Sequence, residues 1–188
     1  MTTTTTRPNH RAIYTGSFDP ITLGHLDVIK RGRVIFDDLI IAIGRNIGKR
    51  EVFGLAERKC MVTELVDEMV AGQPDGGSVS VETYDGLTVD FARAKNARVI
   101  LRGIRNITDL AYECQLAMTN RTVADLETVF IMTSQEYAYT SSNLIKQIAA
   151  LGGSVDHLHT IVPRNVIEAL RKLQADKGLA HLIEDHVD

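Results

Sequence analysis

The sequence predicts an α/β fold, a doubly wound parallel sheet of five strands with helices on both faces. Three observations predict it. Short apolar segments alternate five times with longer segments of helical periodicity. One apolar run, Leu39–Ile43, is continuous and rich in isoleucine, as strands buried on both faces are. The alternation shows no internal repeat or linker, so we expect a single domain over residues 12–175.

The first half of the chain is expected to form two strand–helix units. Ala12–Tyr14 is a short apolar strand, and Thr22–Phe36 has apolar residues at helical spacing. After the buried strand Leu39–Ile43 comes a polar loop, Gly44–Gly54. Leu55–Val70 is predicted to be the second helix, because methionine and leucine side chains recur in it four residues apart.

Two further strands are expected in the middle of the chain. A turn at Gln73–Gly77 leads into Ser78–Thr83, where valines alternate with polar residues as in a half-buried strand. Leu87–Lys95 is predicted to be a helix. Val99–Leu101 is the fourth strand, and it runs directly into a basic segment.

The last elements carry clear terminal signals. Thr108–Thr122 is predicted to be a helix that Thr108 or Asp109 can cap. Thr128–Met132 is the fifth strand. Ser141–Leu151 is a helix with a serine cap, closed by two glycines. Pro163–Gln174 is the final helix, with proline at its first position.

The overall composition is that of a soluble globular protein. Of the 188 residues, 44% are hydrophobic and 24% are charged, and the net charge is -3, which disfavours nucleic acid or a membrane as a partner. Residues 1–11 are threonine-rich and lack the apolar core of a signal peptide, so we expect a flexible tail and a cytoplasmic location. Residues 176–188 are expected to form a polar tail.

Cysteine and histidine usage points to structure rather than to a metal site. Cys60 and Cys114 lack metal-ligand spacing and each lies in a predicted helix, which favours buried thiols over redox chemistry. His157 and His159 lie two residues apart before the last helix, but no third ligand is evident. We therefore predict no metal-ligand set in the protein itself.

The turn after the first strand has the features of a phosphate-binding site. Gly16 lets a ligand approach the backbone closely, and the following helix start offers unpaired N–H groups and a positive dipole end. Ser17 and Thr22 add hydroxyls. His25 adds a ring that stays neutral near the helix charge and still donates from one nitrogen. The alternative is a plain capped turn with a solvated histidine.

Two more segments fall at the carboxyl ends of strands, where doubly wound sheets bind ligands. Arg102-Gly103-Ile104-Arg105 follows the fourth strand, and its two arginines suit phosphate oxygens. Tyr137-Ala138-Tyr139-Thr140-Ser141-Ser142-Asn143 follows the fifth strand and opens a helix. A solvated basic turn and ordinary helix capping are the alternatives for each alone, but three such segments together favour a nucleotide site.

Two single residues are weaker candidates. Lys49 lies in the loop after the second strand, where a flexible cation can reach a reacting phosphate, although a surface lysine is the commoner case. Glu113 lies on the helix after Arg105. Its carboxylate can accept from ribose hydroxyls, but a solvated helix face explains it equally well.

The order of these motifs resembles that of the bacterial phosphopantetheine adenylyltransferases. The series comprises Thr-Gly-Ser-Phe-Asp-Pro, Thr-x-Gly-His, Arg-Gly-x-Arg, a tyrosine–glutamate pair, Asn-Arg and a serine-rich helix start, and it covers Arg11 to Leu173. The wider nucleotidyltransferase superfamily, with a Rossmann-like fold, is a more distant resemblance. Many of its members carry His-x-Gly-His, whereas this chain has Thr22 in the first histidine's place, as the phosphopantetheine enzymes do.

The resemblance implies transfer of the adenylyl group of ATP to 4'-phosphopantetheine, giving dephospho-coenzyme A and pyrophosphate. It implies that His25 stabilises the transition state, with Lys49 as a second catalytic residue. It implies ATP contacts by Ser17, Phe18, His25, Gly103, Ile104, Arg105, Glu113, Tyr137, Ala138, Tyr139, Thr140, Ser141, Ser142 and Asn143. It implies acceptor contacts by Ser17, Lys49, Thr88 and Arg102. It also implies magnesium held through phosphates, a hexamer, and inhibition by coenzyme A.

The sequence departs from the family pattern without losing a group that the chemistry needs. Thr15 stands where proline is usual, Thr88 where larger apolar residues also occur, and Asn143 where a third serine is common. One rival is a sister nucleotidyltransferase using nicotinamide mononucleotide or a cytidylyl donor, which a substrate panel tests. The other is a non-catalytic nucleotide-binding module, which would bind ATP without releasing pyrophosphate.

Overall fold

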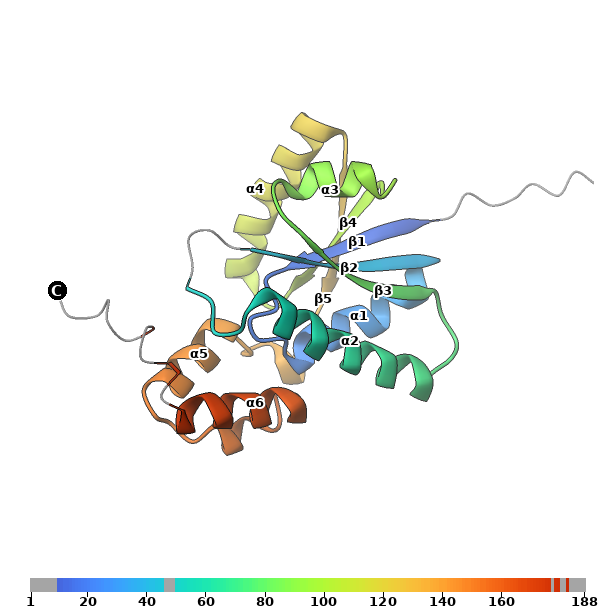
Figure 1. The fold of residues 1–188 in the computed structure, drawn as a ribbon. Coiled ribbons are helices and arrows are strands. Elements are labelled where there is room, and N and C mark those ends of the chain that lie inside the picture. Colours follow the sequence, from blue (N-terminus) through green and yellow to red (C-terminus); the bar gives the residue numbers. More distant parts are fainter. Residues whose placement is uncertain (1–9, 46–49, 177, 180–181, 183–188) are drawn as a thin grey trace, which may run out of the picture.

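A five-stranded parallel sheet forms the centre of the protein, with strand order β3-β2-β1-β4-β5 (Figure 1). The structure is a computed structural model that describes residues 10–45, 50–176, 178, 179 and 182. The strands are β1 (Arg11–Gly16), β2 (Asp38–Gly44), β3 (Ser78–Tyr84), β4 (Val99–Ile104) and β5 (Glu127–Met132). All five predicted strands are confirmed, each within three residues of its expected ends.

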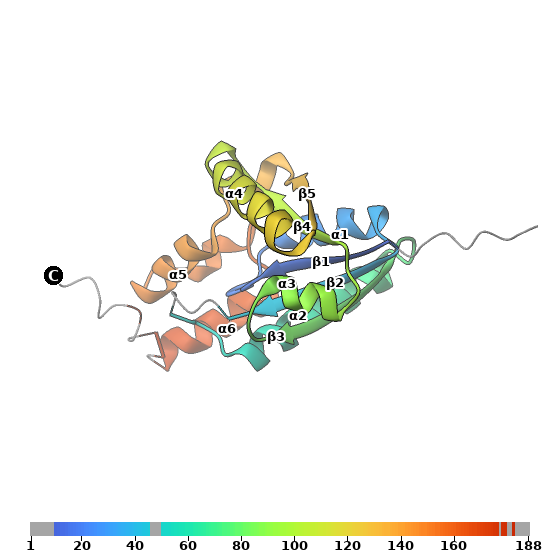
Figure 2. The ribbon, with the colours of Figure 1, turned by 90° about the horizontal axis from the view of Figure 1, so that it is seen from above.

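Helices cover both faces of the sheet, which confirms the predicted fold class. The helices are α1 (Leu23–Ile35), α2 (Leu55–Gly72), α3 (Thr88–Ala94), α4 (Ile107–Ala124), α5 (Ser142–Ala150) and α6 (Arg164–Ala175). Figures 1 and 2 show α1 and α2 on one face and α3 and α4 on the other, with α5 and α6 extending the first layer. Two short 3₁₀ helices, Gln135–Tyr137 and Val155–Leu158, were not predicted.

Successive side chains of the central strand β1 point to opposite faces of the sheet and pack in two separate hydrophobic cores. Tyr14 of β1 packs in the core beneath α1 and α2, whereas its neighbour Ile13 packs in the core beneath α3 and α4. Both side chains are almost fully buried. A strand with two buried faces is largely apolar, which is why Leu39–Ile43 of β2 is a continuous apolar run and Ala12–Tyr14 of β1 is a shorter one.

The strand order reverses beside β1, and this reversal creates the binding crevice. Tyr14 pairs with Ile41 of β2 on one side and with Leu101 of β4 on the other. The chain builds outward from β1 through β2 to β3, and then returns across the sheet to β4. The helices that follow β1 and β4 therefore leave toward opposite faces, and their strand ends open a crevice between them.

The structure corrects three predicted boundaries. β4 continues through Ile104, because its last residues pair with β5 as far as Met132. Arg102 and Gly103 therefore lie in the strand and not after it. Asn106 caps α4, since its side chain accepts from the N–H of Asp109, and the two predicted caps lie inside the helix. Pro163 is the N-cap of α6 and not its first residue.

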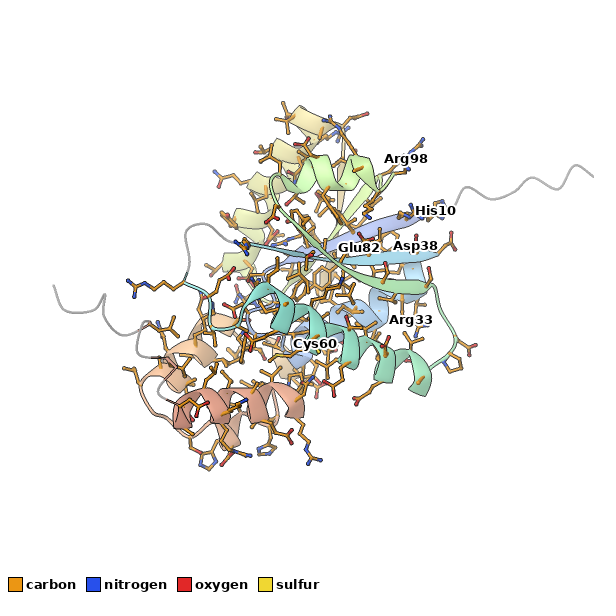
Figure 3. All side chains as sticks on the ribbon, viewed as in Figure 1. His10, Arg33, Asp38, Cys60, Glu82 and Arg98 are labelled. Atoms are coloured by element: carbon orange, nitrogen blue, oxygen red, sulfur yellow. The ribbon has the colours of Figure 1, made fainter. Side chains whose placement is uncertain are left out.

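The prediction of buried thiols was wrong for Cys60, which is exposed on α2 (Figure 3), while Cys114 is half-buried. The buried residues of α2 are Arg58, Val62 and Val66, four residues apart. Cys60 lies two positions from Arg58, about 200° around the helix, and so faces away from the core. Helical position and not residue type sets its exposure.

A buried carboxylate fastens the turn after β1 to two other segments. Asp19 is 2% exposed and accepts from the backbone N–H groups of Val52, at 3.0 Å, and Phe53, at 2.9 Å. The same carboxylate forms an ion pair with Lys146 of α5. Because a buried charge needs such partners, Asp19 fixes the β2–α2 loop and α5 relative to the turn.

The buried guanidinium of Arg58 completes this anchoring. It donates to the carbonyl oxygens of Ser17, at 2.7 Å, and Gly44, at 3.1 Å, and its Nε donates to Phe53 at 3.0 Å. These carbonyls belong to the turn after β1, the end of β2 and the loop before α2. One side chain therefore satisfies the backbone of three segments that converge beneath the crevice.

Among the described residues beyond α6, two leucines pack with the core, and Leu182 is the partly buried one. Leu179 is 3% exposed and packs in the core beneath α1 and α2. None of the helices among the described residues is both long enough and apolar enough to cross a membrane.

Candidate active site

A polar cavity of about 270 Å³ opens at the carboxyl ends of β1 and β4. All three sequence segments predicted to bind a nucleotide contribute to it. The lining residues are Tyr14, Thr15, Gly16, Ser17, Phe18, Thr22, Gly24, His25, Arg102, Gly103, Arg105, Asp109, Glu113, Thr133, Thr140, Ser141, Ser142 and Asn143. The cavity thus gathers hydroxyls, two arginines, a histidine and the N-termini of α1 and α5.

Local capping fixes the orientation of His25. Thr22 is the N-cap of α1, and its backbone N–H donates to Nδ1 of His25 at 3.0 Å. A backbone N–H can only donate, so Nδ1 is an acceptor and the neutral ring carries its proton on Nε2. Nε2 has no hydrogen-bond partner among the described residues, and it is the nitrogen available to a ligand.

The surroundings keep this ring neutral. Burial, together with the positive charges of Arg105 and Arg102, lowers the pKa of His25 to about 4 from its ordinary value of 6.5. The sequence anticipated a neutral ring, but attributed it to the helix alone. A neutral imidazole that donates from Nε2 is suited to an anion whose negative charge increases during reaction.

Arg102 and Glu113 form a fork at the base of the cavity. Nε and Nη2 of Arg102 donate to the two oxygens of Glu113 at 2.7 and 2.5 Å, and Nη1 donates to the carbonyl of Thr15 at 2.5 Å. Burial acts to lower the pKa of Arg102, but the hydrogen bond and charge of Glu113 outweigh it and raise that pKa. Arg102 is therefore a permanent, fixed cation.

Arg105 directly follows β4 and contacts the segment that leads into α5. Its Nε and Nη2 donate to the carboxylate of Asp109 at 2.8 and 2.9 Å, and Nη1 donates to the carbonyl of Thr140. Thr140 is buried, and its hydroxyl has no hydrogen-bond partner among the described residues. Each of the two arginines in the cavity lining is thus held by one carboxylate.

A smaller hollow of about 120 Å³ adjoins the cavity on the side of α3 and α4. It shares Thr15, Arg102 and Glu113 with the cavity. Its other lining residues are Thr88, Ile100, Leu116, Ala117, Asn120 and Thr128. The two spaces together suit an elongated ligand with an anionic group near Arg102.

Comparison with known proteins agrees with the resemblance in the motifs. A family model described as cytidylyltransferase-like matches residues 13–148. The phosphopantetheine adenylyltransferase of Rhodopirellula baltica is 48% identical over 161 residues, which cover 85% of this chain and 86% of that protein. The enzyme of Thermosynechococcus vestitus is 46% identical over 85% of this chain and 89% of its own length.

The chain belongs to the phosphopantetheine adenylyltransferase family. The fold agrees with that of other adenylyltransferases of solved structure. A nicotinic acid mononucleotide adenylyltransferase of Plasmodium falciparum, complexed with NaAD, superposes with a TM-score of 0.63 at 14% identity, covering 88% of this chain and 96% of that one. At that identity the likeness shows the fold alone.

Most of the predicted site residues of this family member meet at the cavity. Ser17, Phe18, His25, Arg102, Gly103, Arg105, Glu113, Thr140, Ser141, Ser142 and Asn143 line it. Ile104, Tyr137, Ala138 and Tyr139 are not among its lining residues, and Tyr139 is 93% exposed. Thr88 lines the adjoining hollow, and Lys49 lies outside the described residues.

Sequence reasoning missed the role of Asp109 in this adenylyltransferase. It was considered as a helix cap, whereas its carboxylate holds the guanidinium of Arg105. The sequence spacing could have predicted this ion pair, because Arg105 stands four residues before Asp109 at the start of a helix. Thr133, which also lines the cavity, carried no signal in the sequence.

We expect the His25 ring to titrate near pH 4 and to carry its proton on Nε2 at neutral pH. The unfolded chain takes up this proton near pH 6.5, so stability that is fully present above that pH is lost as pH falls toward 4. Long-range proton–nitrogen NMR spectra report both the tautomer and the midpoint, and His25→Gln assigns the signal. A midpoint near 6.5 would contradict the expectation.

Proposed function

We propose that this chain transfers the adenylyl group of ATP to 4'-phosphopantetheine, giving dephospho-coenzyme A and pyrophosphate. The observation that carries the proposal is the cavity at the reversal of strand order, where a neutral histidine, two fixed arginines and two helix N-termini converge. Curated relatives at 44–48% identity carry the name of this enzyme. They favour it over a sister nucleotidyltransferase and over a non-catalytic binding module.

In this proposal the cavity holds ATP. The N-terminal turn of α1 and the hydroxyl-rich start of α5 would bind its phosphates, since unpaired N–H groups at helix starts favour anions. Inside the cavity the ATP contacts would come from Ser17, Phe18, His25, Gly103, Arg105, Glu113, Thr140, Ser141, Ser142 and Asn143. Ile104, Tyr137, Ala138 and Tyr139 lie outside its lining and would contact only a part of ATP that extends beyond it.

The adjoining hollow would take the arm of the acceptor, with the acceptor phosphate at the junction. Arg102 lines both spaces and is the fixed cation there. Thr88 and Ser17 would add hydroxyl contacts, and Lys49 would reach the reacting phosphates.

The reaction would be a direct in-line displacement. An oxygen of the acceptor phosphate attacks the α-phosphorus of ATP, the new phosphorus–oxygen bond forms, and the bond to the β-phosphate breaks to release pyrophosphate. The attacking oxygen is already ionised, so no general base is required. The contribution of this chain is positioning and charge stabilisation, with Nε2–H of His25 donating to the phosphate oxygens as their charge grows.

Magnesium would enter as its complex with ATP. Asp109 and Glu113, the two carboxylates that line the cavity, are each engaged by an arginine. The described residues hold no cluster of three or more ligating side chains. Phosphate oxygens would therefore supply most of the ligands of the ion, which would neutralise phosphate charge there.

The remaining parts of the proposal follow from the family. They are a hexameric assembly, inhibition by coenzyme A, which shares the pantetheine arm, and a cytoplasmic location. Light scattering measures the assembly directly, and a monomer at working concentration would overturn that part.

The test is pyrophosphate release from ATP and magnesium, with and without 4'-phosphopantetheine. We expect release only with the acceptor, and dephospho-coenzyme A as the product. Release with nicotinamide mononucleotide instead would favour the sister enzyme. ATP binding without release from any acceptor would favour the binding module.

A further inference from the structure

A tyrosine outside the proposed mechanism lies beside the adjoining hollow. Tyr84 ends β3, and its hydroxyl oxygen lies 2.8 Å from Oγ1 of Thr88, the first residue of α3. Thr88 in turn lines the hollow together with Arg102. A hydroxyl–hydroxyl hydrogen bond therefore connects the edge strand to the space proposed for the acceptor.

Two other contacts hold the Tyr84 ring independently of this hydrogen bond. The ring stacks on Phe91 of α3, with centroids 4.8 Å apart and planes at 26°. It also lies against Gly44 at the end of β2, where an added Cβ would be 2.8 Å from the hydroxyl oxygen of Tyr84. Glycine at position 44 leaves the room that the hydroxyl occupies, and the stacking fixes the plane of the ring.

The hydrogen bond to Tyr84 leaves Thr88 with further capacity. A hydroxyl donates one hydrogen and accepts through two lone pairs, and the bond to Tyr84 uses only one of these. Thr88 can therefore hydrogen-bond a neutral polar group in the hollow. The arm of 4'-phosphopantetheine carries amides, each of which offers one donor and one acceptor.

We propose that Tyr84 is a positioning residue for the acceptor, whose hydroxyl holds the Thr88 hydroxyl in place to hydrogen-bond an amide of the acceptor arm. This inference rests on the proposed function, from which the acceptor is taken. Tyr84 acts through Thr88 and touches no reacting atom.

The experiment compares steady-state kinetics of Tyr84→Phe with those of the unmodified enzyme. The variant loses the hydroxyl and keeps the stacked ring. We expect the KM for 4'-phosphopantetheine to rise about three- to tenfold, as for one neutral hydrogen bond, with kcat and the KM for ATP within about twofold. A structural role would instead change all three parameters or the melting temperature.

A double-mutant cycle tests the route through Thr88. We expect Thr88→Val to raise the same KM, and Tyr84→Phe combined with Thr88→Val to raise it no further, because the two hydroxyls act as one unit. The control is Thr122→Val, the same chemical change on the exposed surface of α4. Among the described residues, the Thr122 hydroxyl donates only to the carbonyl oxygen of Met118 in its own helix.

Each outcome decides the inference. An unchanged KM for the acceptor in Tyr84→Phe, or effects of Tyr84→Phe and Thr88→Val that multiply, would overturn it. Failure of the proposed function is seen separately, because the unmodified enzyme would then release no pyrophosphate in response to the acceptor, and the inference would fall with it.

Discussion

His25→Ala is expected to lower kcat by about two to three orders of magnitude while leaving the dissociation constant of ATP within about threefold. The reason is the tautomer. Thr22 occupies Nδ1, so Nε2 is the only ring donor, and its hydrogen bond to phosphate strengthens as negative charge builds in the transition state. Single-turnover kinetics and calorimetric titration with ATP measure the two quantities separately.

The matched control is His25→Gln. His25 closes the capping box of α1, and removing the ring leaves the Thr22 N–H without that partner, at a cost of about 1 kcal/mol in stability. Glutamine is a normal residue at this position of a capping box and restores the helix start. We expect it to recover the melting temperature and only a small part of kcat. Equal losses in kcat and in ATP affinity for His25→Ala would make His25 a binding residue and nothing more.

Local patterns in the sequence were sufficient to predict the strands and α-helices and their order, but not the two short 3₁₀ helices. The cap Ser141 was identified because a helix start depends on a few adjacent residues. Thr22, which the structure shows to be the N-cap of α1, was placed at that helix start, with capping considered only as the alternative to phosphate binding. The position of the crevice followed as well, since the topology of a doubly wound sheet dictates where ligands bind. Both predictions depend on short-range sequence signals or on a general rule of topology.

Pairing between distant elements was beyond the reach of these patterns. Asp19 and Lys146 meet from opposite ends of the chain, and no periodicity connects them. Glu113 was left between a ribose ligand and a solvated residue, but it is buried against Arg102, which lies on a different element. The exposure of Cys60 likewise depends on which face of α2 meets the sheet. These features are set by tertiary packing.

Arg102→Met is expected to have the largest combined effect on stability and activity. The substitution leaves the Glu113 carboxylate, whose side chain is only 10% exposed, without its cation. Breaking a fully buried pair costs about 3–5 kcal/mol of the free energy of unfolding, and the cost here should be smaller because the Arg102 side chain is 26% exposed. It also removes the fixed charge proposed for the acceptor phosphate, so kcat/KM for the acceptor should fall by about a hundredfold or more.

The double variant Arg102→Met, Glu113→Gln separates the two effects. It removes both charges from the pair, so urea denaturation should show most of the lost stability recovered. The activity should stay low, because neither methionine nor glutamine attracts a phosphate. Arg102→Lys keeps a charge but not the planar fork that reaches both oxygens of Glu113. It should therefore retain only part of the stability and only part of kcat/KM for the acceptor. Recovery of kcat/KM in the double variant would mean that Arg102 only balances Glu113, and the acceptor phosphate would then have to bind elsewhere along the cavity.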